Sequence, residues 1–274
     1  VAGSESRSLL KIDDHGQPIW TARYLAESNV ALRVLRTVPT RDAAIAVLGA
    51  SDAGSSFELL RVGQAGGVAF RRAYTLPLDA CATPAARVLA NDGIDGTGTG
   101  FVVAGECAGQ GRTFVVHLDA HGDVLGARLW ADSAGGGGIS PAAITRAGSD
   151  LVLVGEVRGT PSGDGMFVAG LDGSGELRSS RGYVACETSF NLSPTTVIPA
   201  DSGGLTVAGG SHAQSRAFVL RLRENGDVGF VTYPGLAEGR APVFVTSAIA
   251  ELPTSGFVMA ASVVERTGEG AAAV

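Results

Sequence analysis

Two of the three cysteines are spaced to form a disulfide bond. Opposed residues of an antiparallel hairpin have numbers with a constant sum. Cys81 and Cys107 centre such a hairpin on Ile94, inside a glycine-rich connection, so we expect them to face each other across two strands. A disulfide there would close a loop of about 26 residues, stabilise the fold by about 3 kcal/mol and indicate an oxidising compartment. The alternative is two reduced, half-buried thiols, and Cys186 finds no partner by the same reasoning.

Charged residues and a histidine near the ends of the expected strands could bind a ligand. Glu106 and Glu156 occupy equivalent positions in successive copies of an internal repeat. Together with a histidine, glutamates are the residue types that act as general acids and bases in hydrolases and lyases. Descent from one ancestral repeat explains their equivalence equally well. The residues that we expect to contact a ligand are Glu106, Arg112, Glu156, Arg158, His212 and Arg240.

The sequence predicts neither a metal site nor a cofactor. The four histidines are scattered, and no Cys-x-x-Cys pair occurs. Asp-Gly clusters such as residues 92–96 lack the alternating acids of calcium sites and are better explained as turns. Gly-x-Ser-x-Gly, His-Glu-x-x-His and phosphate-binding loops are absent. We therefore assign no residue a catalytic role.

The composition restricts the class of protein. The chain of 274 residues has 40 glycines, 45% hydrophobic residues and only 18% charged residues, which favours many short strands joined by tight turns. Its net charge is −6 and no long run of Lys or Arg occurs, which argues against nucleic acid as a partner. No apolar run reaches the length of about 18 residues that a membrane-spanning helix needs.

An internal repeat organises these elements. One phrase is an apolar strand, a glycine turn and a second strand that ends near an aromatic residue. Its turn glycines are Gly16, Gly66, Gly122, Gly175 and Gly226. A second phrase of the Phe-Val-Val-Ala-Gly type lies between successive copies, and a less regular apolar segment precedes it. Each repeat of about 50 residues therefore holds four short strands, which we name A, B, C and D, with tight A–B and C–D turns.

Four antiparallel strands per repeat are typical of a β-propeller blade. An open solenoid and a row of sandwiches are the alternatives. We expect one all-β propeller domain over residues 1–274, with repeats at 4–49, 50–105, 106–155, 156–209 and 210–261 and a partial strand at 271–274. Since the strand B phrase recurs near both ends, the chain is expected to be part of a ring of about six to eight blades, completed by other domains or chains. A closed ring of about five blades is the alternative.

The repeat resembles the bacterial β-propeller-repeat family of secreted and cell-surface proteins. The similarity rests on the Phe-Val-x-x-Leu-Asp-x-x-Gly phrase, as in Phe114–Gly122, and it extends over nearly the whole chain. The resemblance implies an extracellular, cell-surface or periplasmic protein. It implies a scaffold or a binding module rather than one defined activity.

Two functions follow as hypotheses. In a propeller the D–A and B–C loops share one face, and they are the longer and more varied loops here. We expect a non-enzymatic binding or scaffold propeller that recognises a protein or a carbohydrate through these loops. The alternative is a hydrolase or lyase with its active site at the channel mouth, formed by Glu106, Glu156 and His212.

Overall fold

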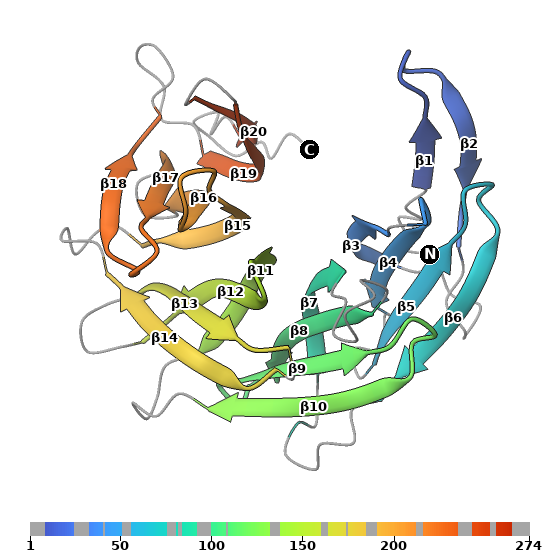
Figure 1. The fold of residues 1–274 in the computed structure, drawn as a ribbon, viewed down its shortest axis with the longest axis horizontal. Coiled ribbons are helices and arrows are strands. Elements are labelled where there is room, and N and C mark those ends of the chain that lie inside the picture. Colours follow the sequence, from blue (N-terminus) through green and yellow to red (C-terminus); the bar gives the residue numbers. More distant parts are fainter. Residues whose placement is uncertain are drawn as a thin grey trace, which may run out of the picture. The chain divides into compact units, whose positions relative to one another are not determined.

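The fold is known from a computed structural model. It describes residues 9–24, 33–40, 42–50, 56–75, 81, 84–91, 100–107, 109–131, 138–159, 164–173, 175–184, 191–211, 216–234, 243–252 and 256–264. These residues form β-strands and turns without a helix (Figure 1). The chain divides into two compact units, Val1–Ala131 and Asp132–Val274.

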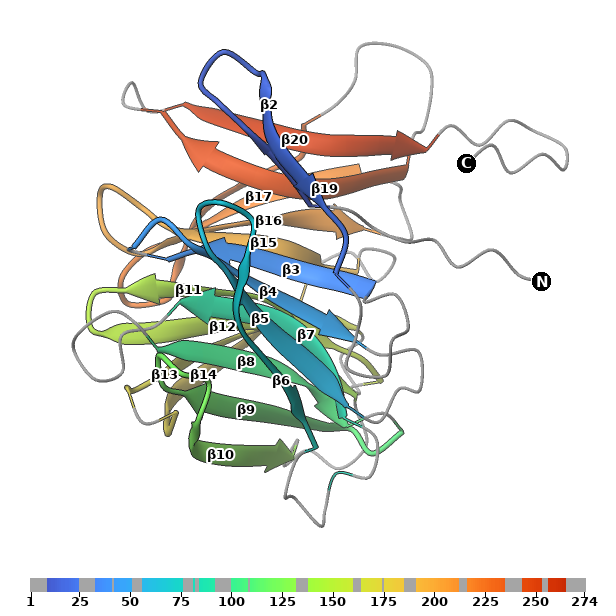
Figure 2. The same ribbon diagram turned by 90° about the vertical axis from the view of Figure 1, so that its right-hand side faces the viewer.

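The first unit contains a two-stranded sheet and two four-stranded sheets, all antiparallel (Figures 1 and 2). The strands are β1 (Leu9–Ile12), β2 (Pro18–Ala22), β3 (Arg33–Pro39), β4 (Ile45–Ala50), β5 (Phe57–Val62), β6 (Val68–Tyr74), β7 (Pro84–Asn91), β8 (Phe101–Cys107), β9 (Arg112–Leu118) and β10 (Val124–Ala131).

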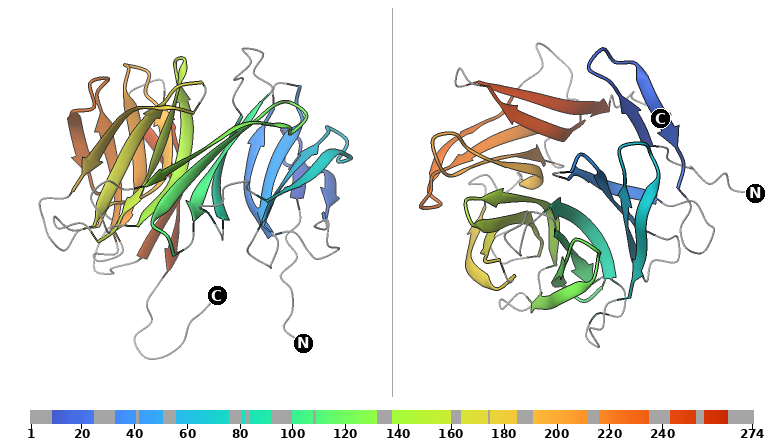
Figure 3. Two further views of the ribbon diagram at one scale, coloured as in Figure 1. Left: turned by 90° about the horizontal axis from the view of Figure 1, so that it is seen from below. Right: turned by 45° about the vertical axis from the view of Figure 1, so that its right-hand side comes forward.

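The second unit contains two four-stranded sheets and one two-stranded sheet (Figure 3). The strands are β11 (Ile139–Ala147), β12 (Asp150–Val157), β13 (Gly165–Leu171), β14 (Leu177–Tyr183), β15 (Ser193–Pro199), β16 (Leu205–Ser211), β17 (Arg216–Leu222), β18 (Val228–Thr232), β19 (Val243–Glu251) and β20 (Phe257–Val264).

Every four-stranded sheet is a meander in which chain neighbours pair, and this is the blade of a β-propeller. The expected propeller fold is therefore confirmed. Each sheet runs from strand A to strand D, over residues 33–74, 84–131, 139–183 and 193–232. Each sheet therefore begins at strand A, whereas each sequence repeat as delimited above begins at strand C, two strands earlier. The sheet β1–β2 is a C–D pair, and β19–β20 is an A–B pair.

The glycine of the strand B phrase has a specific structural cause. In each A–B pair the register shifts by one residue opposite this position, as at Pro194↔Gly209 and Thr196↔Ala208. The bulged strand A and the phenylalanine of strand C both approach the glycine. A Cβ at Gly209 would lie 2.7 Å from the Pro194 Cα and 2.8 Å from the Phe218 ring. The residue must therefore be small, because the bulge and the ring already occupy its side-chain space.

The aromatic residue at the end of strand D binds the neighbouring blade. The Tyr74 hydroxyl donates a hydrogen bond to the Gly122 carbonyl oxygen over 2.7 Å, and the Tyr183 hydroxyl donates to that of Gly226 over 2.8 Å. Tyr24 makes the same contact with Gly66 in the first unit. The acceptor in each case belongs to a C–D turn glycine with positive φ. This contact explains why the repeat couples a turn glycine to an aromatic residue.

Buried side chains between successive sheets form the core of each unit. In the first unit the Phe57 ring stacks on both Tyr74 and Phe114, with centroids 5.1 and 6.1 Å apart. In the second unit Met166 and Phe218 belong to one buried cluster between the sheets β11–β14 and β15–β18. The C strands supply most of the large, fully buried side chains, among them Phe57, Phe114 and Phe218.

The Cys81–Cys107 disulfide is confirmed, with the two Cα atoms 5.2 Å apart. The expected register was wrong, however. Pro84 rather than Cys81 lies opposite Cys107, and Cys81 precedes β7. The pairing of Asn91 with Phe101 centres the hairpin beyond Ile94, which moves the partner of Cys107 toward later residues of the chain, and the bulge at Arg87 moves it back by only one residue. Cys186 lies outside the described residues.

Candidate functional site

The structure places the predicted residues of the first unit at the end of the β8–β9 hairpin. Glu106 forms an ion pair with Arg87, the bulged residue of β7. Arg112 lies opposite Cys107 in the same hairpin, so Glu106 and Arg112 are near neighbours beside the disulfide. The Glu106 side chain is about one-quarter exposed.

In the second unit Glu156 and Arg158 form an ion pair, in which the Arg158 Nε donates to the Glu156 carboxylate over 2.7 Å. Glu156 lies opposite Ser140 and Met166 at the end of β12. His212 and Arg240 lie outside the described residues, as do most of the D–A and B–C loops. The prediction that these loops bind a ligand therefore stays a prediction.

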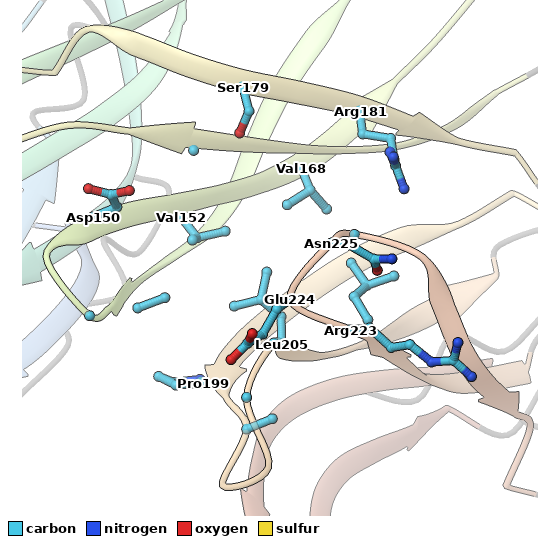
Figure 4. A pocket seen from close by; sticks show the side chains of 18 of the residues that line it. Asp150, Val152, Val168, Ser179, Arg181, Pro199, Leu205, Arg223, Glu224 and Asn225 are labelled. Atoms are coloured by element: carbon cyan, nitrogen blue, oxygen red, sulfur yellow. The ribbon is translucent and has the colours of Figure 1, made fainter.

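A cavity of about 730 Å³ lies between the sheets β11–β14 and β15–β18, at the end that carries the A–B and C–D turns (Figure 4). We name it the inter-blade cavity. Val152, Val168, Leu205 and Leu222 form its apolar part. Its size is that of small-molecule sites, which span about 300–1,000 Å³. The sequence did not predict it.

The cavity coincides with a change in one repeated residue pair. The second-to-last residue of each C strand lies opposite a D-strand residue, and the pairs are Lys11–Trp20, Arg61–Phe70, His117–Gly126, Gly170–Ser179 and Arg221–Phe230. Three of these pairs join a long basic side chain to an aromatic ring. In the sheet β11–β14 both partners are small, and both line the cavity. Alignment of the copies at this position would have revealed it.

Two carboxylates and a hydroxyl supply hydrogen-bonding groups. Asp150 comes from the start of β12, Ser179 from β14 and Glu224 from the C–D turn after β17. In Figure 4 their side chains border the same space. Among the described residues, neither Asp150 nor Glu224 forms an ion pair. The carboxylates are thus available to accept hydrogen bonds from a ligand.

Glycine lets the Glu224 side chain lie against the neighbouring A–B turn. A Cβ at Gly203 would lie 2.9 Å from the Glu224 carboxyl carbon. Gly203 has a φ of +83°, which favours glycine for a second reason. The Glu224 carboxylate is therefore positioned between two turns of the same blade.

A tyrosine and an ion pair close one end of the cavity. Arg181 forms an ion pair with Asp227 at 3.0 Å, and the Tyr183 hydroxyl donates a hydrogen bond to the Gly226 carbonyl oxygen. Burial raises the pKa of Tyr183 above its ordinary value, so the phenol keeps its proton and its hydrogen bond. Because Asp227 already neutralises Arg181, the positive charge of Arg181 is not free to attract an anion.

A second cavity, of about 820 Å³, lies between the sheets β15–β18 and β19–β20. Here Arg221 lines the space and donates hydrogen bonds to Thr206 at 2.7 Å and to Glu251 at 3.2 Å. Both charged side chains are largely buried, at 12% and 14% exposure. Arg221 and Glu251 in this second cavity thus bind one another, whereas Glu224 lines both cavities.

No group of three or more His, Cys, Asp or Glu side chains gathers to hold a metal ion within the described residues. None of the described segments forms a helix with the length and apolarity that crossing a bilayer requires. Asp172, in one of the Asp-Gly clusters, accepts a hydrogen bond from the Glu176 amide at 3.0 Å, which is the role of an aspartate in a turn.

Comparison with known proteins identifies the fold. No protein-family model and no curated protein match the chain. A protein of unknown function from Bacteroides caccae is 15% identical with a TM-score of 0.58, and the match covers 94% of this chain and 80% of that one. A protein from Lactobacillus plantarum is 16% identical with a TM-score of 0.52, over 83% and 68% of the two chains.

The periplasmic gluconolactonase of Pseudomonas aeruginosa is also 16% identical, with a TM-score of 0.51. The match covers 82% of this chain and 62% of the gluconolactonase. Similarities at this level of identity establish the propeller-like fold and carry no activity over to this chain.

Proposed function

We propose that this protein is a non-enzymatic binding propeller that acts outside the cytoplasm and recognises a protein or a carbohydrate ligand. The inter-blade cavity is the observation that carries the proposal. It combines an apolar surface with a few polar groups, which is the usual composition of a ligand site. The predicted contacts Glu106, Arg112, Glu156 and Arg158 do not line this cavity, and we propose that they belong, with His212 and Arg240, to further binding surfaces at the D–A and B–C loops.

The disulfide supports the proposed location. Structural disulfides persist in secreted and periplasmic proteins and are rare in the reducing cytosol. Cys81 and Cys107 are both buried, at 4% and 1% exposure, so the bond is protected from reductants in solution. A member of the bacterial secreted propeller-repeat family would have the same location, and we propose that membership.

A hydrolase or lyase is the second candidate, because one solved structure with a similar fold is a gluconolactonase. The glutamates that this hypothesis requires are each bound by an arginine, Glu106 by Arg87 and Glu156 by Arg158. Because an arginine of the same blade already engages each carboxylate, we propose that the two glutamates form structural ion pairs rather than a catalytic pair.

A binding screen with a parallel turnover assay tests the proposal. The purified chain would be applied to a carbohydrate array and incubated with lactones and glycosides under the same conditions. We expect saturable binding of a carbohydrate or of a protein partner, with every bound compound recovered unchanged. Turnover that is lost in a Glu156→Gln variant would establish the enzyme hypothesis instead, and an absence of any binding would reject the binding propeller.

A further inference from the structure

We propose that the inter-blade cavity binds a saccharide unit that carries no negative charge, and that the small pair Gly170–Ser179 makes this possible. The inference rests on the proposed binding function and specifies its ligand and its site. It is drawn from the chemistry of the lining residues, from their charges and from the comparison of the repeat copies.

The lining residues match the two kinds of surface that a sugar ring presents. Hydroxyl groups around a ring donate hydrogen bonds, and ionised carboxylates accept them more strongly than neutral groups do. Asp150 and Glu224 supply such acceptors, and Ser179 adds a hydroxyl that both donates and accepts. The C–H groups of the ring need an apolar surface, which Val152 and Val168 provide.

Charge sets the class of saccharide. The charged lining residues for which the described part of the chain shows no ion pair are Asp150, Glu224 and Arg223, which leaves a net negative charge, whereas Arg181 is neutralised by Asp227. In Figure 4 the Arg223 side chain extends away from the carboxylates. An anionic sugar would be repelled, a neutral sugar accepted, and a sugar with an amine would gain an ion pair.

Another copy of the repeat carries large residues at the positions of Gly170 and Ser179, and introducing these residues here should fill the cavity. At the matching position in the first unit, Arg61 lies opposite Phe70 on strand D and opposite Ala46 on strand B. Gly170 has the same arrangement, with Ser179 on one side and apolar Val152 on the other. A Cβ at Gly170 would lie 2.8 Å from the Ser179 Oγ, so a larger residue at Gly170 requires the Ser179 side chain to move or to be replaced. The double variant Gly170→Arg with Ser179→Phe therefore recreates a pair that this fold already contains.

The test uses the full chain and ligand-observed NMR with glucose, galactose and mannose, their 2-amino derivatives and their uronic acids. We expect binding of at least one neutral hexose and tighter binding of its 2-amino derivative, with no binding of the uronic acid. Glu224→Gln should weaken binding of the amino sugar about tenfold and that of the neutral sugar less, since the amide keeps a hydrogen-bond acceptor but loses the charge.

The double variant should abolish binding while its circular dichroism and unfolding temperature remain those of a folded chain. The single variant Ser179→Phe, at an exposed strand position, provides the same test if the double variant does not fold. The matched change Gly182→Ala, at a position with open space around it, should leave binding unaltered.

Two results would overturn the inference in different ways. Preferential binding of uronic acids, or binding of none of the sugars, contradicts the ligand class. Sugar binding that survives the Ser179→Phe and double variants places the site elsewhere, in which case the cavity assignment fails and the proposed binding function stands.

Discussion

At the scale of single residues, the hydroxyl of a D-strand tyrosine couples one blade to the next. Tyr74 is buried, and its hydroxyl donates a hydrogen bond to the Gly122 carbonyl oxygen. Removing the hydroxyl would leave that buried acceptor without its partner, which typically costs about 1–3 kcal/mol. The neighbouring Arg72–Asp123 ion pair is solvent-exposed and contributes little by comparison.

Tyr74 should make the first unit sensitive to alkaline pH. Burial raises the pKa of Tyr74 far above its ordinary value of 10.0. The unfolded chain loses this proton near pH 10 and the folded chain keeps it, so the stabilisation is complete below about pH 10 and is lost as the pH rises through the folded pKa. We expect the free energy of unfolding in urea to fall above about pH 10, and to fall less in Tyr74→Phe than in wild type.

The same change in Tyr233, an exposed tyrosine directly after β18, serves as the control. If wild type and Tyr74→Phe lose stability in parallel above pH 10, the tyrosine contact does not have the assigned role.

Some of these residue contacts were predictable and others were not. The Cys81–Cys107 bond followed from the spacing of the two cysteines, although the register behind it was wrong because the strands pair around a point beyond Ile94. The inter-blade cavity depends on Gly170 and Ser179, two small residues in a glycine-rich chain. Nothing marks them as unusual until the copies are compared position by position.

At the scale of the element, the strand B glycine determines how strand A can bulge. The sequence predicted the C strands closely, since a phenylalanine within a short apolar run marks four of the five. It could not predict the bulges, because the bulged residues Leu35, Arg87, Ala142, Thr195 and Ser247 share no residue type. What the five positions share is a small residue opposite them on strand B.

Replacing that glycine tests its role. In Gly209→Ala the new Cβ would meet the Ser193 carbonyl oxygen and the Pro194 Cα, which are backbone atoms that cannot move aside easily. We expect a loss of about 2–4 kcal/mol in urea unfolding of the second unit. Gly182→Ala in β14, which meets nothing within 4 Å, should change stability by less than about 0.5 kcal/mol. Equal effects of the two substitutions would contradict the packing explanation.

At the scale of the whole molecule, the two compact units should respond differently to reduction. The disulfide lies entirely in the first unit and closes a sequence separation of 26 residues. Its removal should destabilise that unit by about 3 kcal/mol.

Alkylation of the unfolded, non-reduced chain should modify one of the three cysteines, Cys186. Tryptophan and tyrosine fluorescence of a Cys81→Ala/Cys107→Ala variant should report an earlier unfolding transition for the first unit alone. Modification of all three cysteines without reductant would remove the support that the disulfide gives to an extracytoplasmic location.

The number of blades belongs to the same scale and stays a prediction. Of the two-stranded sheets, β1–β2 is a C–D pair and β19–β20 is an A–B pair. The expectation of a larger ring rested on strand B phrases at both ends, and residues 1–8, which carry the first of them, are outside the described residues.

Chemical-shift mapping of the sugar-bound protein tests the binding account most directly. Several residues that line the inter-blade cavity are glycines, including Gly148, Gly170, Gly203 and Gly226, and glycine amide nitrogens resonate in a separate spectral region. Titration of the isotope-labelled chain with a neutral or amine-bearing hexose should shift these amides and leave the turn glycines Gly16 and Gly66 of the first unit unchanged. Sugar-induced shifts confined to other residues, or an absence of shifts at saturating sugar, would contradict the account.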